Sequence, residues 1–177
     1  DDSADDIDDF SGRVSARWTP NDRWDIQISS EMNRFRDGNA CFNTLDQVSQ
    51  NPHDVAVDYN GKSDYDSTGQ VLRLGYKGDL FNLTAITALR NEKAQDKNDL
   101  DFSPVDLMRL DNRADNDLFS QEVRVTSPDD GKALQWLAGL YYFTEKKDQS
   151  IDMGYRQATP LPAPYPSIPP YNYIIDS

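Results

Sequence analysis

Residues 13–29, RVSARWTPNDRWDIQIS, decide the fold class, because apolar and polar side chains alternate on both sides of a short turn. A period of two places alternate residues on one face of a β-strand. The apolar positions are Val14, Ala16 and Trp18 before the turn and Trp24, Ile26 and Ile28 after it. We predict a hairpin around Pro20-Asn21-Asp22 in which Thr19 faces Arg23, so that Trp18 pairs with Trp24 and Arg17 lies opposite Asp25.

Two further stretches follow the same plan. In residues 72–85 the apolar positions are Leu72, Leu74, Tyr76, Phe81, Leu83 and Ala85, around a Gly78-Asp79 step that suits a type II′ turn with Lys77 opposite Leu80. The third stretch runs from Phe119 to Val125, turns at 128–131 and returns from Leu134 to Tyr142. We therefore expect an all-β fold of about six antiparallel strands, in hairpins at about 11–36, 68–92 and 117–146.

The hairpins have short turns, whereas the connections between them are long and acidic, at about 1–10, 37–67, 93–117 and 147–177. Transmembrane β-barrels have short periplasmic turns, long extracellular loops and aromatic girdles. The pattern predicts a fragment of such a barrel, with a lipid-facing girdle of Trp18, Trp24, Tyr76, Phe81 and Trp136. Charged residues facing the lumen or a plug are then Arg13, Arg17, Asp25, Arg73, Arg90, Glu122 and Arg124.

A soluble β-sandwich is the alternative that alternation leaves open. It would be a ligand-binding module of the carbohydrate-binding type, using aromatic side chains as stacking platforms. That fold predicts that one set of apolar residues is buried in a single core, namely Trp18, Trp24, Leu74, Leu83 and Trp136.

Composition excludes several classes of function. With 31 acidic against 18 basic residues the net charge is −13, which disfavours binding to nucleic-acid phosphates. The longest apolar run, Trp136 to Phe143, is too short for a transmembrane helix. Cys41 and His53 are single, so neither a disulfide nor a Cys/His zinc site can form within the chain. We expect no cofactor and no metal site, and no cluster of residues in the sequence contradicts the absence of enzyme activity that the family resemblance described below implies.

The third hairpin carries a family resemblance. Its Ser120-Gln121-Glu122 strand and its return strand, with Trp136, Gly139 and Tyr141-Tyr142, resemble the barrel region of TonB-dependent outer-membrane receptors. The resemblance implies a plugged 22-stranded barrel in a Gram-negative outer membrane that imports a scarce nutrient, most often a ferric siderophore. A passive porin is the second membrane alternative. Because neither a plug nor a coupling box is recognisable, and the chain opens at Asp1 and ends at Ser177, we expect a piece of a longer protein.

In such receptors the extracellular loops capture the ligand. The candidate ligand-binding residues are therefore the loop aromatics and two arginines, Phe42, Tyr59, Tyr65, Phe102, Arg109 and Arg113. The expected partners are outer-membrane lipid and lipopolysaccharide, a small-molecule nutrient, and the TonB energy-transducing protein, reached through the plug region. No nucleic-acid partner is expected.

Overall fold

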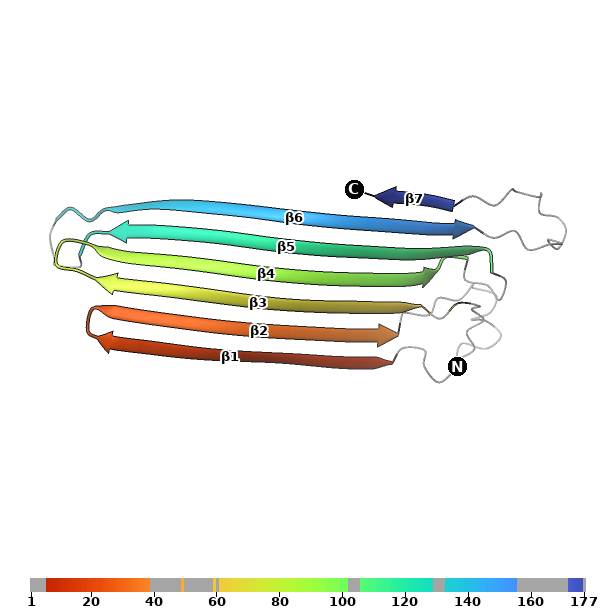
Figure 1. The fold of residues 1–177 in the computed structure, drawn as a ribbon, viewed down its shortest axis with the longest axis horizontal. Helices are drawn as coiled ribbons and strands as arrows, with labels where there is room; N and C mark the ends of the chain where they lie inside the picture. Colours follow the sequence, from red (N-terminus) through yellow and green to blue (C-terminus); the bar gives the residue numbers. More distant parts are fainter. Residues whose placement is uncertain are drawn as a thin grey trace.

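The chain forms one antiparallel sheet whose strands follow sequence order from β1 to β7 (Figure 1). The computed structural model describes residues 6–38, 49, 59, 61–101, 106–128, 133–155 and 172–176. The strands are β1 Ile7–Asn21, β2 Trp24–Gly38, β3 Lys62–Lys77, β4 Asn82–Asp99, β5 Met108–Thr126, β6 Leu137–Tyr155 and β7 Asn172–Asp176. The all-β antiparallel prediction is confirmed. Within the described residues the sheet is open, since β1 pairs only with β2. No helix there is long and apolar enough to cross a membrane.

The strands extend well into the segments expected to be loops. β3 begins at Lys62, β4 continues to Asp99, and β5 begins at Met108. β6 reaches Tyr155, and the short β7 pairs with its end. Away from the turns both faces of the strands are polar, so the alternation that reveals a strand disappears while the backbone ladder continues.

The first hairpin keeps the predicted faces but not the predicted partners. Trp18 pairs with Ile26, and a bulge lies between Trp18 and Asn21. The side chain of Asn21 closes the turn, because its Oδ1 accepts hydrogen bonds from the backbone N–H groups of Arg23 and Trp24, at 3.0 and 3.2 Å. Pro20, which lacks an N–H, lies at the bulge of an edge strand, where it costs no ladder bond.

The second hairpin is also displaced by two residues. Lys77 pairs with Asn82, so the loop spans 78–81 rather than Gly78-Asp79 alone. The type II′ prediction is wrong, because Gly78 does not have the positive φ that this turn requires. Glycine is needed there for space: a Cβ would lie 2.7 Å from the carbonyl oxygen of Phe81.

Register assigns every side chain in β1 to β6 to one of two faces. We call the side that carries Trp24, Ile26 and Ile28 the belt face and the opposite side, which carries Asp25 and Gln27, the polar face. No hydrophobic residue is buried anywhere in the described part of the chain. Trp18 is 64% exposed and Trp136 44% exposed, so the single core that the sandwich alternative predicts is not present in this sheet.

Candidate functional site

The belt face has an uncharged zone next to the short turns. On each of the six long strands, taken together with the turn-side residue that adjoins β4, β5 and β6, the belt-face side chains carry no charge over at least nine consecutive residues. These stretches are 10–18, 24–32, 68–76, 81–89, 119–127 and 136–144, and together they form what we call the uncharged belt. Many of its apolar side chains face solvent here, including Val14 at 75% and Leu140 at 81% exposure.

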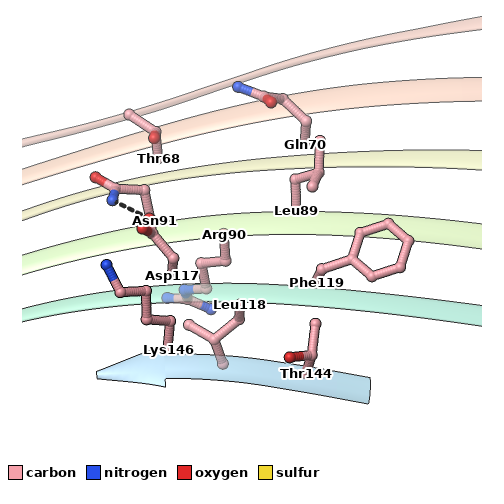
Figure 2. Close-up of a pocket in the computed structure, with 10 residues that line it drawn as sticks. All are labelled: Thr68, Gln70, Leu89, Arg90, Asn91, Asp117, Leu118, Phe119, Thr144 and Lys146. Carbon is pink, nitrogen blue, oxygen red and sulfur yellow. Dashed lines mark hydrogen bonds between the residues drawn. The ribbon is translucent and has the colours of Figure 1, made fainter. Parts of the chain in front are cut away.

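Charge begins abruptly beyond the belt. One continuous row across the sheet pairs Arg34, Asp66, Lys93, Asp115 and Asp148 in that order. A hollow of about 370 Å³ lies at this border, with Leu89 and Phe119 on the belt side and Lys146 on the charged side (Figure 2). In it Asn91 Nδ2 donates to Asp117 Oδ1 at 2.6 Å. The belt-face side chains therefore change from uncharged to charged within about one residue pair along the strands.

The predicted girdle residues lie at the opposite border of the belt, beside the short turns. Trp24, Tyr76 and Phe81 form a chain of aromatic contacts, with ring centroids 4.9 Å apart for Trp24–Tyr76 and 6.3 Å for Tyr76–Phe81. Trp18 and, immediately before β6, Trp136 occupy belt-face positions in the same zone. The five residues thus share one face and one end of the sheet.

The polar face holds all the residues predicted to face a lumen or plug, namely Arg13, Arg17, Asp25, Arg73, Arg90, Glu122 and Arg124. They are joined in ion pairs rather than isolated.

Asp25 is the centre of the most connected group. Arg17 binds its carboxylate through two nitrogens, at 2.9 and 3.0 Å, and Arg73 Nη1 lies 3.4 Å from Oδ2. Elsewhere on this face Arg13 pairs with Glu31 at 2.6 Å, Arg90 with Glu92 at 2.7 Å, and Arg124 with Glu122.

The structure brings only some of the predicted ligand-binding residues together. Tyr65 lies in β3 on the polar face, whereas Arg109 and Arg113 lie in β5 on the belt face. The loop placement of these three residues is therefore wrong. Tyr59 stacks against Arg109, whose guanidinium carbon is 4.5 Å from the ring centroid. Phe42 and Phe102 lie outside the described residues.

The guanidinium group of Arg113 forms an ion pair with Asp111, a carboxylate on the same strand. Its Nη2 lies 2.8 Å from Asp111 Oδ2, and this hydrogen bond raises the pKa of Arg113. Burial acts to raise the pKa of Asp111, but hydrogen bonds from Gln95 and Arg113 and the charges of Arg113 and Lys97 outweigh it and hold that pKa below its ordinary value. An anion would have to compete with Asp111 for the Nε and Nη2 donors of Arg113.

Sequence reasoning missed Phe35, which stacks on Tyr65 with ring centroids 5.8 Å apart and an interplanar angle of 20°. Phe35 and Tyr65 are direct partners across β2 and β3. The available signal was the register: continuing the β2 alternation from Asp25 puts Phe35 on the polar face.

No family model matches the chain. Within the described residues no group of three or more His, Cys, Asp or Glu side chains could hold a metal ion.

Proposed function

We propose that this chain forms part of the barrel wall of a TonB-dependent receptor that imports a scarce nutrient across a Gram-negative outer membrane. The uncharged belt is the observation that carries the proposal. Its nine residues per strand match the roughly 9–11 residues that a tilted transmembrane strand needs. Exposed apolar side chains at this density, bordered by aromatic rings on one side and a charged row on the other, are what a lipid-facing surface requires.

The slant of the belt gives independent support. On β1 it runs from Trp18 to Phe10, and on β6 from Trp136 to Thr144. The residues paired across the sheet connect Trp18 with Leu140 and Phe10 with Asp148. Relative to these rows, both borders of the belt on β6 lie four residues closer to the turns. Four residues are about 14 Å along a strand, and five strand spacings are about 24 Å, which gives a slant of about 30°. Strands in membrane barrels tilt by roughly 35–45° from the axis, so a flat bilayer would trace a similar slant across the sheet.

The polar face suits the inside of a barrel. Paired arginines and carboxylates are stable against water or against a polar plug, and they are costly against lipid. The free edge of β1 cannot face hydrocarbon with unpaired backbone groups. The proposal therefore requires further strands of the same protein to pair with β1, and it expects this 177-residue piece neither to insert nor to fold stably alone.

Fractionation of the source cells tests the proposal. The native gene product should be found in the outer-membrane fraction with a mass several times 20.1 kDa. Uptake of its nutrient should stop when the inner-membrane energy-transducing protein is deleted, while binding to the cell surface persists. A water-soluble product near 20.1 kDa would rule the proposal out. Uptake that continues without the energy-transducing protein would favour the porin alternative.

A further inference from the structure

The polar face changes character along the strands. Next to the turns it carries the arginines, whereas its far half consists of three successive rows of paired residues that we call the distal polar surface. The rows are Ser11, Asn33, Ser67, Glu92, Asn116 and Lys147; Asp9, Phe35, Tyr65, Ala94, Ala114 and Gln149; and Ile7, Asp37, Ser63, Asp96, Asn112 and Ile151. Four carboxylates against the single ammonium group of Lys147 give these 18 residues a net charge of −3.

An aromatic platform lies in the middle of this surface. Phe35 and Tyr65 stack on each other and are each only half-buried. Tyr65 Oη donates to Glu92 Oε1 at 3.0 Å, which fixes the orientation of the ring. The next two positions in the same row are Ala94 and Ala114, whose small side chains rise little above the sheet beside Tyr65. A ligand that lies on the rings would therefore meet a preorganised surface.

Amide, hydroxyl and carboxylate groups surround the platform, and Arg90, the cation that contacts Tyr65, is paired with Glu92 at 2.7 Å. Asn33 Nδ2 donates to Ser67 Oγ at 3.0 Å, and Ser63 Oγ donates to Asp96 Oδ1 at 2.6 Å. On the far side of the two alanines, Gln149 Nε2 donates to Asn112 Oδ1 at 3.0 Å. The Oδ1 atom of Asn116 is buried and accepts no hydrogen bond within the described part of the chain. Amides, hydroxyls and carboxylates of this kind can exchange hydrogen bonds with ligand hydroxyl groups.

We infer that the distal polar surface binds an uncharged, hydroxyl-rich ligand, a carbohydrate, and that this is the cargo class of the receptor. A sugar ring combines an apolar C–H face, which packs on aromatic rings, with hydroxyl groups at its rim that reach the surrounding amides and carboxylates. The net charge of −3 on this surface repels anionic ferric chelates. The inference rests on the proposed function, because only a barrel places this face toward the passing cargo.

Binding by the full-length protein, purified in detergent, tests the inference without requiring transport. The probes are an array of neutral oligosaccharides of glucose, galactose, mannose or xylose, followed by calorimetry with the best binder, and an anionic ferric tricatecholate complex. The test variant is Phe35→Ala. Its matched control is Phe10→Ala, which removes an exposed ring from the belt face one residue pair away.

We expect a neutral oligosaccharide to bind, and Phe35→Ala to weaken it by about tenfold while Phe10→Ala leaves it within about twofold. The inference is overturned if the ferric complex binds and no oligosaccharide does, if neither binds, or if both variants weaken the oligosaccharide equally. Each of these results leaves the fractionation test untouched, so a failure of the cargo class is distinguishable from a failure of the receptor.

Discussion

Placing a positive charge in the middle of the uncharged belt tests its contact with lipid most simply. Ile28 lies four residues from each end of the belt on β2, between Trp24 and Met32, and its side chain is 55% exposed. Four residues are about 14 Å along the strand, which places Ile28 near the bilayer midplane in our proposal. An arginine on the lipid face costs about 2–4 kcal/mol at the midplane and about 0–1 kcal/mol near the interfaces.

We therefore expect Ile28→Arg to lower the free energy of unfolding by about 2–4 kcal/mol, and Met32→Arg by no more than about 1 kcal/mol. Ser29→Arg, one residue away on the polar face, is the matched control, and it should cost less than about 1 kcal/mol because its side chain enters a wet, charged surface. The assay is urea unfolding of the full-length protein in lipid vesicles, followed by tryptophan fluorescence. Equal costs for Ile28→Arg and Ser29→Arg would refute the reasoning, as would the absence of a difference between Ile28→Arg and Met32→Arg.

Two further predictions concern the turn and the charged end of the sheet. Gly78→Ala should destabilise the second hairpin by about 1–2 kcal/mol, because its Cβ would lie 2.7 Å from Phe81 O, whereas Gly154→Ala, with open space around the Cβ, should stay within about 0.5 kcal/mol in the same unfolding assay. Because the pKa of Asp111 is lowered in the folded protein, its stabilising contribution is complete above its ordinary pKa of 3.8 and is lost as the pH falls through the lower folded value. Asp111→Asn should therefore flatten the acid-side decline of stability below about pH 4, and an unchanged decline would show that Asp111 contributes nothing.

The faces of the sheet were predictable from the sequence, and the partners were not. Both short hairpins were displaced by two residues, and a displacement by two keeps every side chain on its own face. The errors came from turn chemistry: Asn21 closes its turn with a side-chain oxygen, and Gly78 begins a longer loop than a type II′ turn allows. Neither feature leaves a trace in hydrophobic periodicity.

The far halves of the strands were harder to predict, and the candidate binding residues depended on them. In the stretch Ser63-Asp64-Tyr65-Asp66-Ser67 both faces are polar, so nothing distinguished a strand from a loop. The pattern therefore predicts a loop position for Tyr65 as it does for Arg109 and Arg113, although the strand register places the two arginines on the opposite face. Once the strand is extended, the partnership of Tyr65 with Phe35 follows directly.

Spin labels placed one at a time along β5 of the full-length protein in vesicles test the central claim directly. On the belt face, labels at Val123 and Phe119 should collide with dissolved oxygen far more than with a water-soluble nickel complex. Labels at the intervening polar-face positions Glu122 and Ser120 should show no such preference for oxygen. From Asp115 outward the oxygen preference should vanish on both faces, because the strand has left the hydrocarbon. Alternation that is absent between Val123 and Phe119, or that continues unchanged past Asp115, would contradict the account.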